Sequence, residues 1–433
     1  MSDPKQKTKG KKHKFVYQSP KGMHDILPRD WVWWNKIVNE GKEVAEFYNF
    51  LRIETPLLED AELFTSALGL DSDVVSKEMF FVKSGGSDKY VLRPEGTASV
   101  ARAYIEHGLH HVSQPVKLYY SGPMFRHEQP QAGRLREFHQ FGFEIMGGNI
   151  DPIYDAQIIL AAYRMLQGIK LKDATVQINS IGCRVCRPHF KKRLLDHYRK
   201  HEKALCADCQ RRIKTNPLRL LDCKSAECQP FKEHAPNLMD GLCLSCNGHL
   251  KGTLEYLDEL SIPYVLNPYL VRGLDYYSKT VFEIFAEGYE SAIVAGGRYD
   301  YLFEMLGGRL SPGVGCALGI ERIIEVLKLK NIDVTLKNRN RLFLVYIGDL
   351  AKKKALKIIE LLRENGVAVR EAFGKDLLKK QMQLADKAQS DFALIIGQKE
   401  VYEETVIVRD LKSGMQEAMP LAKLIPEIKK RLK

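Results

Sequence analysis

The N-terminal part of the chain begins with an amphipathic pattern. Apolar residues from Trp34 to Tyr48 recur at mostly helical spacing, with polar residues between them. The pattern predicts one long helix over residues 30–51. Pro56 follows shortly afterwards and prevents the helix from continuing, because proline lacks an amide hydrogen and clashes with the preceding turn.

A series of short apolar or alternating segments follows and predicts strands. They lie at residues 79–82, 89–93, 116–125, 135–146, 264–265, 281–285 and 292–295. Residues 320–329 then show helical periodicity. Residues 183–253 interrupt the series with short, polar, cysteine-rich sequence, which indicates an insertion. We therefore expect one domain of mixed strands and helices over residues 15–330, interrupted by this insertion.

Beyond residue 330 the pattern changes to strands that alternate with helices. Apolar or extended segments at residues 342–347, 367–369 and 392–396 alternate with helical patterns at residues 352–363 and 377–388. This alternation is typical of a small α/β layer domain on a largely parallel sheet. We expect such a domain over residues 331–433.

The composition is that of a globular protein with several domains. The 433 residues include 45% hydrophobic and 28% charged residues, which excludes collagen-like and disordered chains. No apolar run approaches the roughly 18 to 20 residues of a membrane span, and residues 1–14 lack the apolar core of a signal peptide. We therefore expect a cytoplasmic protein that does not associate with membranes.

The net charge of +12 is concentrated in two segments. Residues 1–14 hold six lysines and one aspartate, which is typical of a basic disordered tail. Residues 183–253 hold fifteen lysines and arginines against seven acidic residues, together with eight of the nine cysteines. This second segment is the better candidate for contact with a polyanionic partner.

Residues 136–145 alternate between two chemically different faces. One face would carry Phe141, Phe143 and Ile145, and the other Arg136, Phe138, Gln140, Gly142 and Glu144. At ~3.3 Å per residue the polar face spans about 26 Å, enough for a nucleotide and a small amino acid laid end to end. An ordinary strand with a polar outer face explains this segment alone equally well. Arg126 on the preceding strand would stand beside the polar face, and its planar guanidinium suits a phosphate.

Several motifs in this order resemble a known family. Residues 124–128 (MFRHE) and 133–140 (GRLREFHQ) resemble motif 2 of the class II aminoacyl-tRNA synthetases, and specifically the histidyl-tRNA synthetase family of bacterial type. The resemblance extends from residue 22 to the end of the C-terminal domain. Residues 30–56 resemble motif 1, and residues 92–97 (LRPEGT) resemble the loop that receives the α-amino group. The two segments characteristic of histidyl enzymes correspond to residues 270–277 (LVRGLDYY) and 295–300 (AGGRYD), and motif 3 to residues 313–322.

The resemblance implies a fold and an activity. The fold would be α+β: a class II catalytic domain on an antiparallel sheet with helices, a cysteine-rich insertion, and a C-terminal α/β anticodon-binding domain. The enzyme would be a homodimer that activates L-histidine with ATP and Mg²⁺ to histidyl-adenylate and pyrophosphate. It would then transfer histidine to the 3′ end of tRNA(His).

The resemblance also implies roles for individual residues. Arg126 and Arg272 would be catalytic, because they compensate the negative charge that develops at the α-phosphate. The residues that bind histidine would be Glu95, Gly96, Thr97, Gln140, Glu144, Tyr276 and Tyr277. The residues that bind ATP would be Arg126, Arg136, Phe138 and Arg322.

The spacing of the cysteines indicates metal binding. Four close pairs lie in the insertion: Cys183/Cys186, Cys206/Cys209, Cys223/Cys228 and Cys243/Cys246. In a cytosolic chain such pairs favour tetrahedral, structural Zn²⁺ over disulfides. We favour two sites, the first and last pairs forming one and the two middle pairs the other; reduced thiols or a single site are the alternatives. The insertion would hold the acceptor arm of the tRNA through its positive charge.

Three other functions compete with this interpretation. A non-catalytic, histidyl-synthetase-like regulatory subunit of histidine biosynthesis would lack the C-terminal domain and would depart from the segment around Arg272. This chain has the C-terminal domain and keeps that segment. A synthetase for another amino acid of the same class is disfavoured by residues 272–277. A zinc-containing RNA-binding protein would not need the arginines that face ATP.

Overall fold

The computed structural model describes residues 17–70, 72–83, 89–130, 133–333 and 341–432. The basic tail predicted at residues 1–14 lies outside this part of the chain. By its internal contacts the chain divides into two compact units, with the boundary at residues 334–335. No helix of the described residues is long and apolar enough to cross a membrane.

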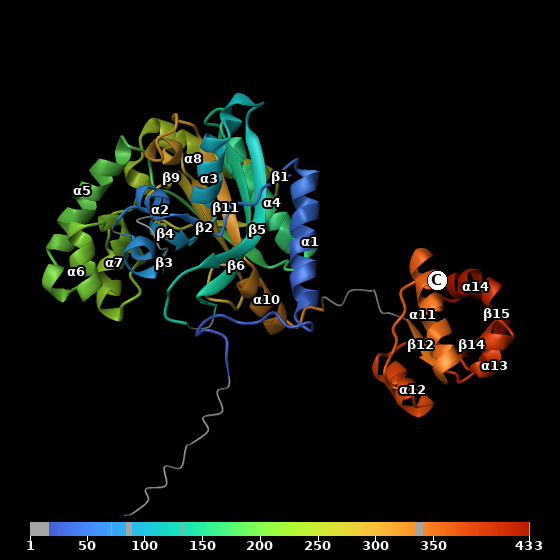
Figure 1. The fold of residues 1–433 in the computed structure, drawn as a ribbon. Helices are drawn as coiled ribbons and strands as arrows, with labels where there is room; N and C mark the ends of the chain where they lie inside the picture. The colour runs from blue at the N-terminus through green and yellow to red at the C-terminus, as the bar shows by residue number, and fades with distance from the viewer. Residues whose placement is uncertain (1–16, 71, 84–88, 131–132, 334–340, 433) are drawn as a thin grey trace, which may run out of the picture. The chain divides into compact units, whose positions relative to one another are not determined.

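The larger unit is built on an eight-stranded sheet with the strand order β1-β5-β6-β11-β10-β9-β7-β8 (Figure 1). Neighbouring strands are antiparallel except at the two edges, where β1 pairs with β5 and β7 with β8 in parallel. The strands are β1 (Leu51–Arg52), β5 (Val116–Phe125), β6 (Glu137–Met146), β7 (Ala174–Ser180), β8 (Tyr264–Leu266), β9 (Ser278–Ala286), β10 (Val294–Arg298) and β11 (Gly313–Gly319). The antiparallel sheet that the resemblance implies is therefore present, and β5 and β6 lie where the hydrophobic pattern predicts them.

One face of this sheet is covered by four helices, α1 (Trp31–Phe47), α4 (Pro152–Gly168), α10 (Ile320–Leu329) and α8 (Leu244–Glu259), the last from the end of the insertion. Their apolar side chains pack against Phe141, Phe143 and Ile145 of β6 in one hydrophobic core. The predicted N-terminal helix is confirmed, but it ends at Phe47, because Asn49 adopts a left-handed conformation with φ 61°.

The opposite face carries a second core and a small sheet. The small sheet has the order β2-β4-β3 and consists of β2 (Leu58–Asp60), β3 (Phe80–Lys83) and β4 (Lys89–Leu92). Around it lie α2 (Ala61–Leu68), η1 (Val74–Glu78), α3 (Thr97–Glu106), η2 (Leu109–His111) and α9 (Leu302–Met305). Tyr120 and Met124 of β5 are buried in this second core, so this face of the large sheet is also largely closed to solvent.

The insertion forms helices and no strand over residues 183–253; most of it packs onto the second core, whereas α8 packs in the first. It contains α5 (Cys186–Arg199), η3 (Glu202–Ala204), α6 (Ala207–Lys214), η4 (Pro217–Asp222), η5 (Ala226–Cys228), α7 (Gln229–Glu233), η6 (Met239–Gly241) and α8 (Leu244–Glu259). Phe190, Leu194 and Ile213 of the insertion belong to the core that also holds Tyr276 and Tyr277. The insertion is therefore continuous with both cores of the larger unit.

The smaller unit has a four-stranded sheet with the order β12-β13-β14-β15 between two hydrophobic clusters. Its strands are β12 (Leu342–Tyr346), β13 (Phe392–Ile396), β14 (Thr405–Asp410) and β15 (Gln416–Pro420). Its helices are α11 (Asp349–Glu364), α12 (Leu378–Lys387), α13 (Gln398–Tyr402), η7 (Leu421–Lys423) and α14 (Leu424–Leu432).

The prediction of a largely parallel sheet in this unit is wrong. Only β12 and β13 are parallel, whereas β13–β14 and β14–β15 are antiparallel. The connections after β13 explain the difference, because residues 397–404 and 411–415 are too few for the crossover that parallel neighbours require. The segment at 367–369 forms no strand and leads only to an isolated bridge between Arg370 and Phe343.

Candidate active site

A cavity of about 150 Å³ lies on the face of the large sheet opposite α1 and α4. Its walls come from the start of α3, from β6, β10 and β11, from the loop after β5, and from residues 272–277. It brings together most of the residues predicted to bind substrates: Glu95, Thr97, Arg126, Phe138, Gln140, Arg272, Tyr276, Tyr277 and Arg322.

β6 distributes its side chains as the alternation predicts. Phe141 and Phe143 are completely buried in the core beneath the sheet, whereas Phe138 and Gln140 line the cavity. The side-chain oxygen of Gln140 is buried and accepts no hydrogen bond from the described residues. Because a buried acceptor without a partner is costly, this oxygen is suited to receive a donor from a ligand.

Glu95 supplies a buried negative charge at the start of α3. Its carboxylate accepts hydrogen bonds from the amides of Thr97 (2.9 Å) and Ala98 (2.7 Å), and the hydroxyl of Tyr276 donates to it over 3.4 Å. Burial raises the pKa of Glu95, and these amide hydrogen bonds and Arg126 oppose the effect. The positive end of the dipole of α3 also stabilises the charged form of Glu95.

Glu144 lies behind the cavity and is not among the described lining residues. It is completely buried, and its carboxyl group accepts hydrogen bonds from the hydroxyls of Thr97 (2.7 Å) and Tyr299 (2.5 Å). Burial raises the pKa of Glu144 to about 8. Glu144 therefore supports Thr97 from behind in this structure.

Two arginines are fixed at the cavity wall by backbone carbonyl groups. Nε of Arg126 donates to the carbonyl of Pro94 (2.9 Å), and the guanidinium lies 5.3 Å from the ring centroid of Phe138. Nε and Nη1 of Arg322 donate to the carbonyls of Gly133 (2.9 Å) and Ala292 (2.8 Å). Neither guanidinium is neutralised by a carboxylate in these contacts, so both present positive charge to the cavity.

Arg272 is held differently, by an ion pair with Glu283 of β9. Its guanidinium also lies 5.9 Å from the ring centroid of Tyr277, and its buried Nε has no partner among the described residues. Arg272 therefore has a free donor next to the residues predicted to bind histidine.

Arg136 does not line this cavity, although it was predicted to bind ATP. Its Nε donates to the backbone carbonyl of Glu128 (3.2 Å). β6 begins only at Glu137, so the period-two alternation does not reach Arg136. Arg134, two residues earlier in the loop, lines the cavity in its place.

Three further residues of the site had no predicted role, although Tyr299 and Glu321 lie in the predicted motifs at residues 295–300 and 313–322. Glu283 pairs with Arg272, Tyr299 donates to Glu144, and the carboxylate of Glu321 accepts the backbone amide of His139 (2.9 Å). Glu283 had a detectable signal, because it is a single acidic residue inside the apolar strand segment 281–285. For the other two the motifs gave the position but not the contact, since their partners are more than 150 positions away in the sequence.

A second, larger cavity of about 670 Å³ adjoins the first and shares Arg126, Arg134, Arg272 and Arg322 with it. The insertion contributes part of its wall. Four basic residues of the insertion line it: Arg212, Arg219, Lys224 and Lys232. Acidic residues line the larger cavity as well, and Asp73 and Glu283 among them pair with Arg219 and Arg272, so basic and acidic side chains alternate along the path from the insertion to the first cavity.

The eight cysteines of the insertion gather in two groups of four, each with all sulfur atoms within 4.8 Å of one another. The base cluster consists of Cys183, Cys186, Cys243 and Cys246, and the inner cluster of Cys206, Cys209, Cys223 and Cys228. This is the grouping that the spacing favours.

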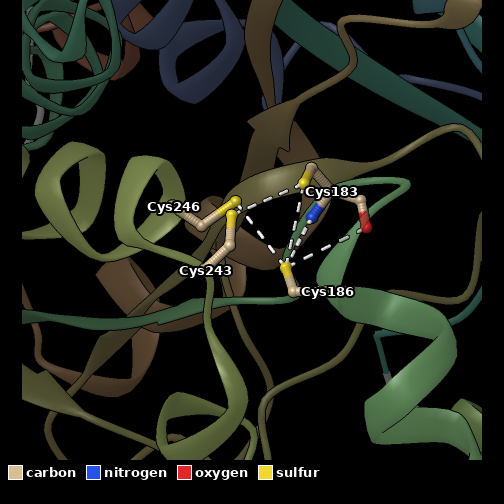
Figure 2. Close-up of side chains that lie close together, drawn as sticks. All are labelled: Cys183, Cys186, Cys243 and Cys246. Carbon is tan, nitrogen blue, oxygen red and sulfur yellow. Dashed lines mark hydrogen bonds between the residues drawn. The ribbon is translucent and has the colours of Figure 1, made fainter.

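Figure 2 shows the base cluster with its four sulfur atoms turned toward one another. Sγ of Cys183 lies 3.8 Å from Sγ of Cys186 and of Cys243, and Sγ of Cys186 lies 3.8 Å from Sγ of Cys246. A tetrahedral zinc site with Zn–S bonds of about 2.3 Å has sulfur–sulfur edges of about 3.8 Å. The residues present therefore fit a zinc ion.

Comparison with known proteins identifies the family. A family model described as histidyl-tRNA synthetase matches residues 22–323, and one described as an anticodon binding domain matches residues 341–431. The chain belongs to the histidyl-tRNA synthetase family. The fold is accordingly a class II synthetase catalytic domain followed by a separate C-terminal anticodon-binding domain.

Relatives within the histidyl-tRNA synthetase family match over the whole chain. A histidine–tRNA ligase of Dehalococcoides mccartyi is 43% identical over 96% of this chain and 100% of its own length. One from Desulforamulus reducens is 41% identical over 95% of this chain and 99% of its own. Among solved structures, apo S. aureus histidyl-tRNA synthetase has a TM-score of 0.80 and 34% identity, covering 95% of this chain and 99% of that one. The regulatory-subunit alternative is less well supported by these matches.

Proposed function

We propose that this aminoacyl-tRNA ligase forms histidyl-adenylate in the cavity between Glu95 and the arginines, and then transfers histidine to tRNA(His). The observation that carries the proposal is that one cavity is lined by a buried carboxylate, an aromatic ring and several guanidinium groups. An α-amino group, an adenine ring and a triphosphate would each find a complementary partner there.

The amino acid would bind at the start of α3. Glu95, Thr97 and the unpartnered oxygen of Gln140 would receive the ammonium group, and Gly96 lets the ligand approach the backbone. Tyr276 and Tyr277 would contact the imidazole. In this proposal Glu144 orients Thr97 and Tyr299 from behind. A site of fixed polar groups rejects amino acids that leave those groups unpaired.

ATP would bind along the arginines. Phe138 and Arg322 would stack on the adenine, while Arg126 and Arg272 would contact the α-phosphate. Arg134 is a better candidate than Arg136 for a further phosphate contact, because it lines the cavity. The histidine carboxylate then attacks the α-phosphorus, pyrophosphate leaves, and the positioned guanidinium groups stabilise the developing charge.

The residues present also fit Mg²⁺, which the family uses with ATP. In such sites Mg²⁺ is bound by substrate phosphates and one or two carboxylates. Glu128 and Glu321 line the cavity together with Arg126 and Arg322. Bound there with ATP, the ion would neutralise charge on the pyrophosphate.

Histidine-dependent ATP–pyrophosphate exchange tests the proposal. The wild-type chain should catalyse exchange with histidine and with no other standard amino acid, and Arg272→Ala should lower the rate by orders of magnitude. Because Arg272→Ala leaves Glu283 unpaired, the double variant Arg272→Ala/Glu283→Gln and the single variant Glu283→Gln are the controls. Near-normal exchange by both Arg272 variants would refute the assignment, and a wild type with no exchange would favour the regulatory alternative.

The tRNA would bind across the insertion and the C-terminal domain. The basic side chains of the larger cavity would hold the phosphates of the acceptor end and lead its 3′ hydroxyl toward Arg272. The anticodon-binding domain at residues 341–431 would read the other end of the tRNA.

Two structural zinc ions would occupy the base and inner clusters. The convergence of the four sulfur atoms in each cluster supports this. Zinc-binding thiols need a reducing compartment, so we place the protein in the cytoplasm.

The protein would act as a homodimer. The exposed apolar residues around the end of α1 and the edge strand β1 support this: Phe47 is 78% and Leu51 68% exposed. An apolar edge of a sheet is a surface that proteins normally cover.

A further inference from the structure

The catalytic segment, defined as residues 270–277, belongs to no helix or strand. It connects β8 to β9 and carries Arg272, Tyr276 and Tyr277. Without a ladder of backbone hydrogen bonds, its position depends on contacts with neighbouring elements. Two of these contacts come from residues that adjoin a cysteine cluster or lie in the stretch that one encloses.

The base cluster is linked to the end of the catalytic segment by Arg187, the residue after Cys186. Nε of Arg187 donates to the carbonyl of Ile181 (3.3 Å), and Nη2 donates to the carbonyls of Gly182 (3.2 Å) and Tyr277 (2.5 Å). The guanidinium of Arg187 thus links residues 181–182, which precede the base cluster, to Tyr277, which is predicted to contact the imidazole of histidine.

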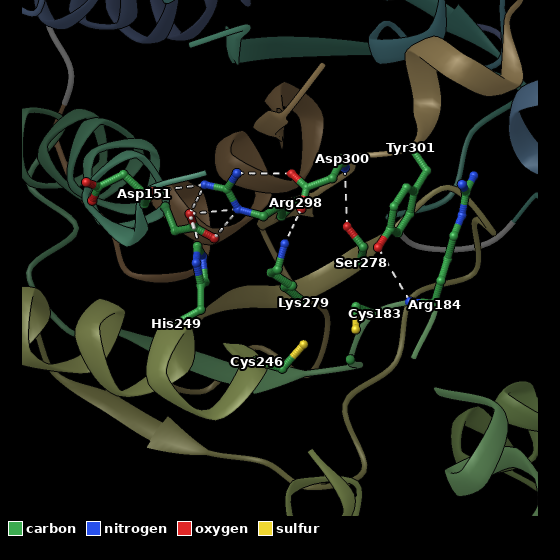
Figure 3. A network of polar contacts seen from close by, with 12 residues as sticks. Asp151, Cys183, Arg184, Cys246, His249, Ser278, Lys279, Arg298, Asp300 and Tyr301 are labelled. Atoms are coloured by element: carbon green, nitrogen blue, oxygen red, sulfur yellow. Dashed lines mark hydrogen bonds and ion pairs between the residues drawn. The ribbon is translucent and has the colours of Figure 1, made fainter. Parts of the chain in front are cut away.

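The other half of the base cluster reaches the same region through α8. Figure 3 shows His249 of this helix pointing into a buried ionic network around Arg298. Nε2 of His249 lies 3.1 Å from the carboxylate of Asp155, which also accepts a hydrogen bond from Nε of Arg298 (3.0 Å). The network continues to Asp300, which pairs with Arg298 (3.1 Å) and with Lys279 (2.6 Å), two residues after Tyr277.

The inner cluster is linked to the middle of the catalytic segment. Its two cysteine pairs enclose residues 210–222, from which Asn216 donates to the carboxylate of Asp275 (2.6 Å). Arg219 of the same stretch forms a partly buried ion pair with Asp73 (2.6 Å) and lies beside Gly273. Asn216 and Arg219 are only 7% and 9% exposed, so the insertion's side of the link is held in packed surroundings, whereas Asp275 and Asp73 remain in part accessible to solvent.

We propose that the two clusters are metal sites that brace the catalytic segment, and that bound metal is therefore required for histidine activation as well as for tRNA binding. Arg187 and Asn216 are positioning residues, which act through Tyr277 and Asp275. The proposal rests on the function proposed above and extends it, because an insertion that served only to hold tRNA would not affect the first step. Thiolate-rich tetrahedral sites of this kind select Zn²⁺.

The full-length enzyme provides the test, because pyrophosphate exchange needs no tRNA. Metal analysis should find two zinc ions per chain, and removal of zinc by a chelator should lower kcat/KM for histidine in the exchange reaction at least tenfold. Added ZnSO₄ should restore it. Circular dichroism before and after removal separates a local effect from unfolding.

Substitutions away from the metal ligands test the links themselves. Arg187→Ala and Asn216→Ala should each raise KM for histidine about tenfold with zinc content unchanged, and Arg187→Lys should recover part of the loss. Lys192→Ala, an exposed lysine on the same helix as Arg187, is the matched control and should behave as wild type.

The outcomes separate the two proposals. Exchange that persists after zinc removal, with a loss confined to tRNA charging, would overturn the bracing role. So would fewer than one zinc per chain, or Arg187→Ala and Asn216→Ala variants with normal KM. No exchange by the zinc-loaded wild type would instead refute the proposed function.

Discussion

Burial changes the protonation of Glu144, and this effect could not be foreseen from its position on the polar face of β6. As a residue on the polar face of β6 it resembles a direct ligand for histidine, but the structure places its carboxyl group behind Thr97 and Tyr299. Removal from water disfavours the charged form and raises its pKa from 4.5 to about 8. At neutral pH and without substrate this carboxyl group is therefore mostly protonated.

This shift predicts a specific dependence of stability on pH. Below pH 4.5 both the folded and the unfolded protein carry the proton. Between pH 4.5 and about 8 only the unfolded state loses it, so stability falls as pH rises through this window. The neutral variant Glu144→Gln should avoid this loss, and its stability relative to wild type should improve by a few kcal/mol between pH 5 and pH 9.

Urea unfolding followed by tryptophan fluorescence measures this effect in the larger unit, since all three tryptophans lie in α1. Glu46→Gln, at an exposed position of the same helix, is the control. A constant difference between Glu144→Gln and wild type across the pH range would contradict the raised pKa.

The positions of the cavity arginines depend in part on local sequence and in part on distant contacts. Arg126 and Arg322 are at the cavity because motifs place them at the end of a strand and the start of a helix. Arg134 and Arg136 are both in one short segment, and only the path of the loop decides which of them faces the cavity. Hydrogen bonds of residues 136 and 137 to Gly22, from a distant part of the chain, set that path.

At the scale of the element, β6 and α3 meet around one aromatic ring. Tyr120 of β5 occupies the space above both Gly96 and Gly142, where an added Cβ would lie 2.3 Å and 2.2 Å from its ring. The absence of a side chain at Gly142 is therefore a packing requirement. Both glycines let the ring pack between β6 and the start of α3.

Gly96→Ala should for this reason disturb the amino-acid site. The added methyl would push Tyr120 or the start of α3 aside, which costs about 1–3 kcal/mol of stability, and displace Glu95 and Thr97. We expect a lower unfolding midpoint and at least a tenfold higher KM for histidine in pyrophosphate exchange.

Gly248→Ala in α8 is the matched control. No atom lies within 4 Å of the added Cβ, and alanine stabilises a helix interior by up to about 1 kcal/mol relative to glycine. If Gly96→Ala behaved as Gly248→Ala does, the close packing of Tyr120 would have no functional consequence.

Hydrophobic periodicity located many of the regular elements and missed others, among them α4, β7 and the last two strands of the small sheet. The pattern predicted β5, β13 and α10 with their observed bounds; the two strands contribute side chains to a core on each face of their sheets, and α10 buries one apolar face. It missed β14 and β15, and with them the antiparallel half of the small sheet. Strand pairing depends on contacts between segments, and the periodicity within one segment does not report them.

At the scale of the whole molecule, the two units have separate cores. The smaller unit buries its own two clusters on either side of its sheet and shares none of their members with the larger unit. The larger unit contains every residue of the cavity. The two steps of the reaction should therefore depend on the units differently.

Deletion of residues 335–433 should leave the first step largely intact. We expect histidine-dependent pyrophosphate exchange within threefold of wild type, and kcat/KM for tRNA(His) in charging at least a hundredfold lower, because the anticodon-binding domain is removed. Tryptophan fluorescence verifies that the remaining unit is folded. A folded truncated protein that charges tRNA normally would exclude a role for the smaller unit in tRNA recognition.

The sequence by itself predicted the two faces of β6 from periodicity and favoured the grouping of the cysteines from their spacing, because both signals lie in short stretches of chain. Its resemblance to the family implied which residues bind the substrates. Only the tertiary structure decided that Glu144 lies behind the cavity, that Arg134 lines it in place of Arg136, and that residues beside the cysteine clusters contact the catalytic segment. These features depend on contacts between residues far apart in the chain. Such contacts form only when the whole core packs, and no local pattern encodes them.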